Sequence, residues 1–297
     1  MNQPSAQAAP QRVVVITGAS SGIGLETAKA FAALGWHVIG QGRDAERSAK
    51  AAAAIKAAAA QGCKVHFLRA NLSLMAETKQ LADEIKGLTD RIDVLINNAG
   101  GVRDQRYVTS EGTEETFSAN HLAPFLLTRE LMPVLETAAA ESEPGAVRVL
   151  AVSSMAYLQP QHGLNWVDLQ RLEGEFPAGA AYCEVKLANQ LFNVELARRV
   201  AGKGIVSQAL VPGPVATNFF KHGDETMQAY EKTAQTLTPQ EVAETLVWMA
   251  TAPETGKDGG RMFYQMAEHT VQPHGKDPVA AERLWNESEI LLASMGY

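Results

Sequence analysis

The chain has 297 residues and a formal net charge of −7, with 46% hydrophobic and 20% charged residues. This composition is typical of a soluble globular protein, and the length allows one large α/β domain or two smaller ones. The acidic balance offers no basic footprint for nucleic acid and no polybasic patch for a membrane surface. No apolar run reaches about 18 residues, so we expect no membrane span.

The two cysteines, Cys63 and Cys183, lie before a predicted strand and within a predicted helix. A disulfide framework is therefore not expected, and a reducing compartment is favoured. Residues 1–10 lack the charged and apolar regions of a signal peptide, so we interpret them as a disordered tail of a cytoplasmic protein. No cluster of histidine, cysteine and carboxylate residues has metal-ligand spacing, and no metal site is expected.

The first element is a short β-branched run at residues 12–17, which suits a strand buried on both faces. A glycine turn at residues 18–24 follows, and then a helical pattern that ends near Gly35. In a βαβ unit such glycines allow a tight turn, a close backbone approach to a pyrophosphate and close helix packing. The helix N-terminus then faces the phosphates, which predicts a dinucleotide site.

The second predicted strand, residues 36–41, ends in Gly42, Arg43 and Asp44. An acidic residue at this place suits the ribose of NAD, whereas an arginine suits a 2′-phosphate. Gly42 stands at the position of the usual acid and Arg43 follows it, which favours NADP(H). Two alternatives stay open: Asp44 could cap the next helix or meet the ribose, and Arg47 could be a second phosphate contact or part of a solvated helix face.

Strands and helices alternate along the rest of the chain, which predicts one doubly wound parallel sheet. We expect a single Rossmann fold over residues 11–297, with about seven parallel strands and helices on both faces. The further predicted helices cover residues 45–60, 75–87, 112–138, 182–201, 239–251 and 279–294, and the further strands cover residues 64–68, 92–96, 146–152, 205–210 and 261–265.

Polar or stiff segments follow several of these strands at the carboxyl edge, where such a fold binds its ligand. Asn71 and Leu72 could reach the adenine, or Asn71 could instead be an N-cap of the next helix. Residues 155–180 are interpreted as a substrate loop. Residues 218–237, with Phe219 and other aromatic residues, suit a lid over a hydrophobic substrate, and a surface helix pair is the alternative.

Tyr182 and Lys186 are four residues apart, so they share one face of a helix. A nearby cation favours phenolate over phenol, so we expect Lys186 to lower the pKa of Tyr182 and make it a proton donor and acceptor. The alternative is a surface tyrosine beside a solvated lysine. His121 and His162 are interpreted as ordinary core or surface residues.

In this order the motifs resemble those of the short-chain dehydrogenase/reductase family. The resemblance spans almost the whole chain and rests on residues 17–24, residues 97–100, Asn120, Ser154, Tyr182, Lys186 and residues 212–217. A narrower similarity, to the retinol-dehydrogenase-like branch, rests on residues 43–44, 181–189 and 281–288 and on the long gap between Ser154 and Tyr182. Two features depart from the family: Asn71 stands where the family usually has aspartate, and we expect no N-terminal hydrophobic anchor.

The resemblance implies that Tyr182 protonates a carbonyl oxygen while hydride arrives from a nicotinamide. It implies that Lys186 tunes Tyr182 and holds the nicotinamide ribose, and that Ser154 donates a hydrogen bond to the developing alkoxide, with Ser153 as the competing candidate. Asn120 would organise water for a proton relay or, alternatively, satisfy helix backbone. The residues expected to contact the cofactor are Gly18, Ser20, Ser21, Gly22, Ile23, Gly24, Arg43, Asn71, Leu72, Asn98, Ala99, Gly100, Tyr182, Lys186, Pro212, Gly213, Val215 and Thr217.

The resulting hypothesis is an NADPH-dependent carbonyl reductase or secondary-alcohol dehydrogenase that acts on a fairly bulky apolar ketone or alcohol. The alternatives are a non-catalytic NADP-sensing protein, an NAD-preferring hydroxysteroid or retinol-type dehydrogenase, and a sugar-nucleotide epimerase or dehydratase. Members of the family often pair through the helices that carry Asn120 and Tyr182, so a homodimer or homotetramer is compatible with the resemblance.

Overall fold

Strand β1 (Val13–Ile16) shows how the sheet is buried on both of its faces. Val13 and Val15 belong to one hydrophobic cluster, whereas Val14 and Ile16 belong to another on the opposite face. Side chains alternate across a strand, so an uninterrupted apolar run supplies both clusters. The structure is a computed structural model that describes residues 10–217, 219, 223–225, 228–229 and 234–297. The predicted tail, except residue 10, therefore lies outside the described residues.

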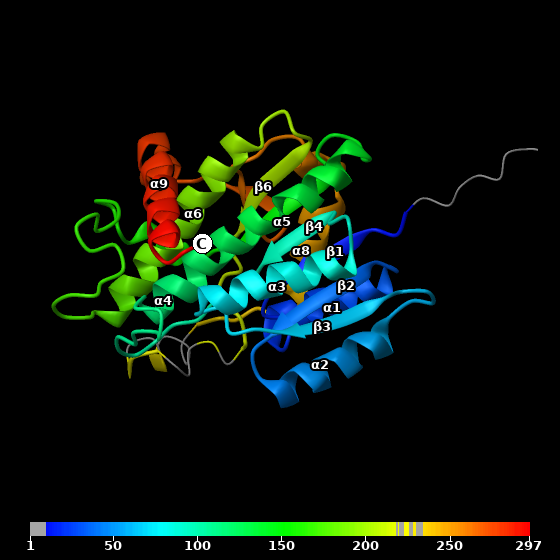
Figure 1. Cartoon of the computed structure of the whole chain (residues 1–297), viewed down its shortest axis with the longest axis horizontal. Helices are drawn as coiled ribbons and strands as arrows, with labels where there is room; N and C mark the ends of the chain where they lie inside the picture. The colour runs from blue at the N-terminus through cyan, green and yellow to red at the C-terminus, as the bar shows by residue number, and fades with distance from the viewer. Residues whose placement is uncertain (1–9, 218, 220–222, 226–227, 230–233) are drawn as a thin grey trace, which may run out of the picture.

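The strands and helices alternate as the sequence predicts (Figure 1). After β1, the strands are β2 (His37–Gly42), β3 (Val65–Arg69), β4 (Val94–Asn97), β5 (Val147–Val152), β6 (Ile205–Leu210), β7 (Met262–Tyr264) and β8 (Ala267–His269). The α-helices are α1 (Gly22–Ala33), α2 (Ala45–Ala58), α3 (Met75–Leu88), α4 (Glu115–Phe117), α5 (Ala123–Ala140), α6 (Ala178–Arg199), α8 (Pro239–Thr251) and α9 (Pro278–Ser294).

The strands form one sheet in the order β3-β2-β1-β4-β5-β6-β7-β8. The pairs from β3 to β7 are parallel, which confirms the doubly wound architecture. The order reverses between β1 and β4, and in such sheets ligands bind in the crevice at that point, beyond the carboxyl ends of the strands.

The sheet also contains an eighth strand that the sequence did not predict. Strand β8 pairs antiparallel with β7 through a two-residue turn at Gln265 and Met266. Both turn residues have positive φ, 48° and 58°, as a tight hairpin of this kind requires. Strand β8 was not predicted because the turn before it contains neither glycine nor asparagine.

Helices cover both faces of the sheet (Figure 1). Helices α3, α5, α6 and α9 contribute to one hydrophobic cluster, and α1, α2 and α8 contribute to the other. The predicted helix at residues 112–138 begins at Glu115 instead and contains a π-helical turn, Ser118–Leu122, before α5 continues it. None of the described helices is long and apolar enough to cross a membrane.

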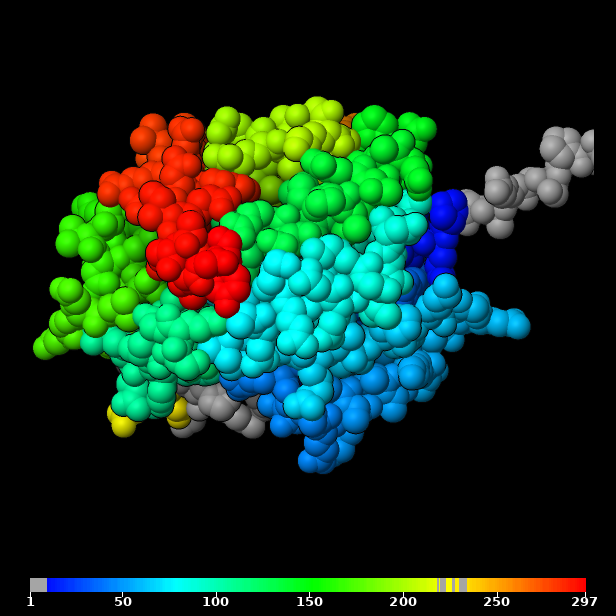
Figure 2. All heavy atoms as spheres, viewed as in Figure 1, coloured from blue at the N-terminus to red at the C-terminus, as the bar shows by residue number. Residues whose placement is uncertain are grey.

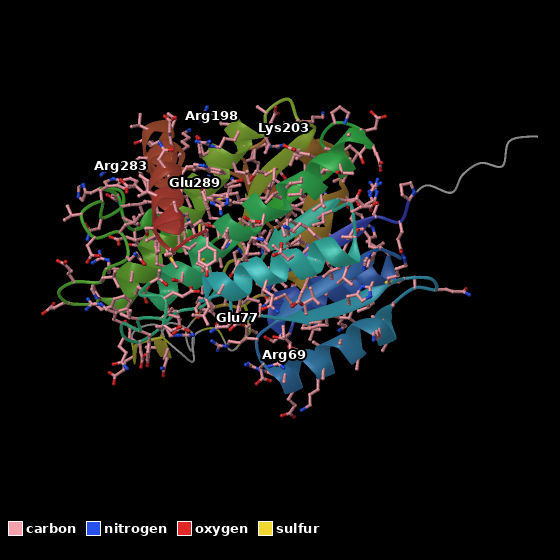
Figure 3. The ribbon with its side chains drawn as sticks, viewed as in Figure 1. Arg69, Glu77, Arg198, Lys203, Arg283 and Glu289 are labelled. Atoms are coloured by element: carbon pink, nitrogen blue, oxygen red, sulfur yellow. The ribbon has the colours of Figure 1, made fainter. Side chains whose placement is uncertain are left out.

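The C-terminal helix α9 packs on the faces of α5 and α6. The Trp285 ring lies 4.6 Å from Phe125 and 5.8 Å from Phe192, centroid to centroid. An ion pair of 2.7 Å joins Arg129 on α5 to Glu289 on α9. Figure 3 labels Glu289. Figure 2 shows the last residues of the chain reaching the surface of the α3 region. These contacts fix α9 across α5, which follows the turn that holds Asn120, and α6, which carries Tyr182.

His121 is buried beneath this helix, with 1% of its surface exposed. The Ser288 hydroxyl donates to the Leu284 carbonyl, so Nε2 of His121 donates to Ser288 Oγ at 2.8 Å. Burial lowers the pKa of His121 from 6.5 to about 3. The residue is thus a neutral core histidine, as the sequence indicated.

This burial predicts acid sensitivity. The folded protein binds a proton on His121 less tightly than the unfolded chain does, so its contribution to stability is complete above pH 6.5 and is lost as the pH falls toward 3. We expect the free energy of unfolding to fall by up to about 1.4 kcal/mol per pH unit for this one proton. Urea unfolding of the wild type and of His121→Asn at several pH values between 3 and 6.5 measures this change. The free energy of unfolding of the variant should depend less steeply on pH. His37, whose pKa burial lowers to about 4, contributes equally to both proteins. Equal slopes would contradict the assignment.

Candidate active site

The glycine turn after β1 has the geometry of a phosphate-binding loop. Gly18 and Gly22 adopt positive φ values of 66° and 54°. A Cβ atom on Gly24 would lie 2.4 Å from the Gly18 carbonyl oxygen, so only glycine fits there. The close approach packs the start of α1 directly against the turn. Ser21, the N-cap of α1, makes no side-chain capping bond, so the first N–H groups of the helix are available to an anion.

Polar side chains hold this turn against its neighbours. Thr17 Oγ1 accepts hydrogen bonds from the backbone N–H groups of Asn98 and Ala99, at 3.0 and 2.9 Å. The Asn98 amide donates back to the Thr17 carbonyl at 2.8 Å. Gln41 accepts from the Gly18 N–H at 3.0 Å and donates to the Ala70 carbonyl at 2.7 Å. This role of Gln41 was not predicted from the sequence, although a polar residue in a buried strand was a signal for it.

The loop after β6 reaches the same turn. A Cβ atom on Gly22 would lie 3.1 Å from Thr217 Cγ2. Gly213 has a φ of 71°, and Val215 forms a parallel bridge with Leu237. The structure therefore brings the predicted residues of three strand ends together: Gly18, Ser20, Ser21, Gly22, Ile23, Gly24, Asn98, Ala99, Gly100, Pro212, Gly213, Val215 and Thr217.

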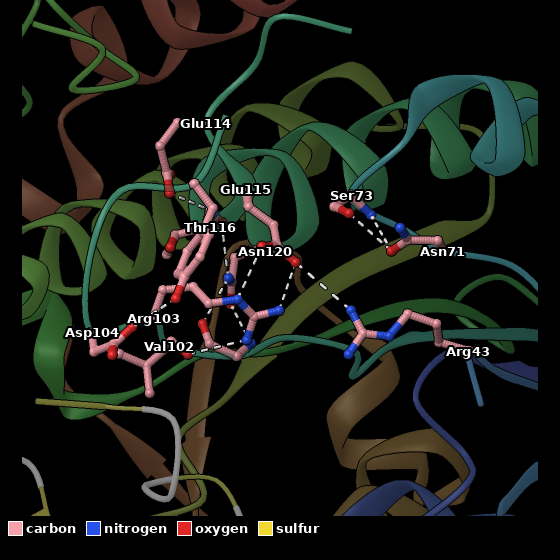
Figure 4. A network of polar contacts seen from close by, with 12 residues as sticks. Arg43, Asn71, Ser73, Val102, Arg103, Asp104, Glu114, Glu115, Thr116 and Asn120 are labelled. Carbon is pink, nitrogen blue, oxygen red and sulfur yellow. Dashed lines mark hydrogen bonds and ion pairs between the residues drawn. The ribbon is translucent and has the colours of Figure 1, made fainter. Parts of the chain in front are cut away.

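The end of β2 lies beside this turn. A Cβ atom on Gly42 would lie 2.9 Å from Ser20 Cβ, so the position of the usual acid has no room for a side chain unless its neighbours shift. Asp44 is the N-cap of α2 and accepts from the Arg47 N–H at 2.8 Å, which confirms the capping alternative. Arg43 points toward Glu115, with 3.7 Å between Nη1 and Oε1 (Figure 4).

Asn71 lies at the end of β3 but does not cap a helix. Its Oδ1 accepts from the Ser73 hydroxyl at 2.9 Å, and α3 begins at Met75 with Leu74 as its N-cap. The N-cap alternative is therefore wrong: the first N–H groups of α3 donate instead to Glu111, from a distant loop. Contact of Asn71 and Leu72 with the cofactor stays a prediction.

Asn120 lies in the π-helical turn and is 1% exposed. Its amide nitrogen donates to the carbonyls of Thr116 and Gly101, at 2.8 and 2.9 Å. Its Oδ1 accepts from the Gly101 N–H at 3.2 Å. Asn120 thus satisfies helix backbone and also fixes the loop after β4, and π-helical turns of this kind are frequent at functional sites.

Tyr182, Lys186 and Ser154 meet at the carboxyl end of β5. Lys186 Nζ lies 5.6 Å from the centroid of the Tyr182 ring and donates to the Val152 carbonyl at 3.3 Å. Ser154 lies beside the Tyr182 phenol, whose pKa it lowers, and its Oγ accepts from the Ala156 N–H. A Cβ atom on Gly100 would lie 3.6 Å from Lys186 Nζ and 2.6 Å from Asn120 Oδ1. The four predicted catalytic residues therefore surround one spot beside the glycine turn.

The electrostatics of the pair differ from the expectation. Burial raises the pKa of Tyr182 above its ordinary value of 10, and the neighbouring Ser154 hydroxyl only partly opposes this. Burial also lowers the pKa of Lys186 to about 8. We expected Lys186 to lower the pKa of Tyr182, but in the free protein the pKa is raised, because the two side chains are 9% and 5% exposed and desolvation disfavours the charged form of each.

Ser153, the competing candidate, has a different environment. It is 2% exposed, and its Oγ has no hydrogen-bond partner among the residues that the structure describes. Its backbone N–H donates to the Leu210 carbonyl, which holds β5 to β6. Ser154, which contacts Tyr182, is therefore the better placed hydroxyl.

The predicted substrate loop is anchored by charged side chains. Arg106 donates to the carbonyls of Arg171, Glu173 and Gly174, at 2.7 to 2.8 Å. The Arg171 guanidinium in turn forms two hydrogen bonds, of 2.7 and 2.6 Å, with the carboxylate of Glu184 on α6. The loop is thereby fixed to both the β4 side and the Tyr182 helix. These arginine anchors were not expected from the sequence.

The predicted lid, residues 218–237, falls partly outside the described residues, and Phe220, Met227 and Tyr230 are among those not described. Phe219 is described, and its ring lies 5.4 Å from the Tyr182 ring, centroid to centroid. One aromatic side chain of this segment thus borders the tyrosine.

Comparison with known proteins is consistent with this geometry. The model of the short chain dehydrogenase family matches residues 12–166. The chain is 31% identical to human retinol dehydrogenase 13, with 97% of this chain and 87% of the relative covered, and 33% identical to mouse polyprenol dehydrogenase, with 97% and 85% covered.

A solved structure has the same fold. The crystal structure of an uncharacterised protein from Mycobacterium paratuberculosis superposes with a TM-score of 0.74 at 30% identity, over 95% of this chain and 93% of that chain. The family match, the relatives and the arrangement of the site agree, and the chain belongs to the short-chain dehydrogenase/reductase family of oxidoreductases, in its retinol-dehydrogenase-like branch.

Proposed function

We propose that this protein is an NADPH-dependent carbonyl reductase and secondary-alcohol dehydrogenase that acts on a fairly bulky apolar substrate. The observation that carries the proposal is the buried Tyr182 phenol, beside Ser154 and Lys186, at the sheet edge that also holds the glycine turn. Such a phenol can give a proton to a carbonyl oxygen and take it back from an alcohol.

The glycine turn fits a dinucleotide, since Gly24 leaves no room for a side chain and the start of α1 is uncapped. When bound, a nicotinamide supplies or accepts the hydride. Lys186 uses one N–H on the Val152 carbonyl and keeps the others for ribose hydroxyls. Ser154 and Tyr182 both direct hydroxyl groups to the place of the substrate oxygen, where two donors stabilise the charge that develops.

The raised pKa of Tyr182 suits the reductive direction. Because burial keeps the phenol protonated, the free protein holds the proton that a carbonyl reduction requires. The oxidative direction requires a phenolate, which the same burial disfavours. The protonation state of the free protein therefore suits carbonyl reduction.

The apolar substrate is supported by two observations. The Phe219 ring lies against the Tyr182 ring. In the loop of residues 155–180, Leu164 is part of the hydrophobic core beside α6, and Leu169 packs against that core. The relatives are named for retinol and polyprenol, both apolar alcohols. A lid formed by residues 218–237 stays a prediction.

NADP(H) is favoured over NAD(H) because Gly42, at the end of β2, stands at the position of the usual acid and Arg43 follows it. An NAD-preferring enzyme of the retinol or hydroxysteroid type and a non-catalytic NADP sensor are the alternatives. A protein that only senses NADP would not need Tyr182, Ser154 and Lys186 to be grouped together. Their grouping therefore supports an enzyme. A cytoplasmic location stays a prediction. A homodimer or homotetramer is also still a prediction. Because α9 packs on α5 and α6, an assembly through these two helices would have to accommodate α9.

The direct test is to follow the absorbance of NADPH, and separately of NADH, with a panel of ketones and aldehydes of increasing apolar size. The proposal predicts turnover with NADPH that is faster for the larger substrates. No turnover with any carbonyl compound, together with tight NADPH binding, would instead favour the sensor.

Tyr182→Phe should reduce turnover at least about a hundredfold, because the variant lacks the proton that the carbonyl oxygen receives. Binding of NADPH, measured by fluorescence, should change little, since the glycine turn is untouched. Tyr157→Phe is a matched control, because the Tyr157 phenol is also buried but accepts from the Gln272 N–H and not from a residue of the site. Retained turnover in Tyr182→Phe would remove this residue from its catalytic role.

Arg43→Gln should weaken binding of NADP⁺ about tenfold, the equivalent of about 1.4 kcal/mol, and leave NAD⁺ binding nearly unchanged. The reason is that only NADP⁺ carries a 2′-phosphate for the guanidinium. Lys50→Gln is the control, since Lys50 is an exposed cation on α2 that pairs with Glu46. An equal loss for both nucleotides would show that Arg43 does not read the phosphate.

A further inference from the structure

One carboxylate, that of Glu115, lies between two arginines from different parts of the fold. Arg43 follows β2, Arg103 lies in the loop after β4, and Glu115 begins α4. Figure 4 shows Arg43 and Arg103 approaching the Glu115 carboxylate from opposite directions. The cluster joins the ribose end of the expected dinucleotide site to the loop that Asn120 holds.

The two arginines bind this carboxylate unequally. Arg103 donates two hydrogen bonds, of 2.6 Å to Oε1 and 3.0 Å to Oε2. Arg43 approaches only to 3.7 Å, and its side chain is 57% exposed, against 23% for Arg103. A bidentate pair of this kind is strong, whereas a long exposed ion pair contributes little to stability. Glu115 is therefore fixed by Arg103, and Arg43 is held loosely.

Glu115 stays ionised at neutral pH. The hydrogen bonds from Arg103 lower the pKa of Glu115, and the charges of Arg103 and Arg43 add to this effect. Glu115 is 19% exposed, so the charge is only partly screened by water. A full negative charge is thus fixed a few ångströms from the guanidinium expected to bind the 2′-phosphate.

From this geometry we propose that Glu115 is a specificity-determining residue that competes with the cofactor's 2′-phosphate for Arg43 and so limits the preference for NADP(H). The inference rests on the proposed role of Arg43. A phosphate that binds Arg43 must replace Glu115 as its partner, and a nucleotide without the phosphate has no such competition. The carboxylate therefore weakens binding of the phosphorylated nucleotide selectively.

The proposal predicts the effect of Glu115→Gln, which keeps the size of the side chain and an oxygen that can accept from Arg103. Removing the charge should tighten binding of 2′,5′-ADP and of NADP⁺ about three- to tenfold, as expected for one unit charge at this range in a solvated site. Binding of 5′-AMP and NAD⁺ should stay within about twofold. Isothermal titration calorimetry on the full chain measures all four ligands without any turnover.

Two comparisons make the result specific. Glu46→Gln is the matched control, because Glu46 is a nearby exposed carboxylate that pairs with Lys50 and not with Arg43. It should not change the ratio of the two affinities. In the Arg43→Gln background, Glu115→Gln should no longer tighten binding of the phosphorylated ligands, because the residue acts through Arg43. Thermal unfolding of each variant shows that the fold is kept.

The outcomes separate this inference from the proposed function. If the wild type binds 2′,5′-ADP no more tightly than 5′-AMP, the preference for NADP(H) fails. If that preference holds but Glu115→Gln leaves the ratio of affinities unchanged or lowers it, only the role of Glu115 is overturned. An equal gain with and without Arg43 would also overturn it, because the carboxylate would then act on the phosphate without Arg43.

Discussion

The arrangement of the site depends on the burial of Tyr182 and Lys186 on one turn of α6. Both side chains are nearly excluded from water, and the space around them is closed by Gly100, Asn120, Ser154 and Phe219. Burial disfavours the charged form of each group, which keeps the phenol protonated and lowers the pKa of the lysine to about 8. A proton donor for a carbonyl oxygen is therefore present before any ligand binds.

Polar contacts across the carboxyl edge of the sheet keep the cofactor turn in register with this pair. Thr17 and Asn98 tie the end of β1 to the end of β4, and Gln41 ties the glycine turn to β2 and β3. Asn120 continues the connection from the loop after β4 into the helix that leads to α5. Each of these bonds joins segments that are far apart in the sequence but adjacent at the switch point of the sheet.

Much of this arrangement could be predicted, because local patterns determine it. Short strand-like runs that alternate with helical patterns predicted seven of the eight strands, and the glycines and the Tyr182–Lys186 spacing predicted where the site lies. The failures are of another kind. The sign of the tyrosine pKa shift depends on how deeply the fold buries the pair, and β8 depends on a turn without glycine. The contacts of Arg106, Arg103 and Glu115 depend on loops whose paths no periodicity reveals.

The central claim, that burial and not Lys186 sets the protonation of Tyr182 in the free protein, can be measured directly. Tyrosinate absorbance is titrated with pH in the wild type and in Tyr182→Phe, without cofactor, and the two curves are subtracted. We predict that the difference shows no ionisation of Tyr182 up to its ordinary value of 10. A tyrosinate signal that belongs to Tyr182 near neutral pH would contradict the account.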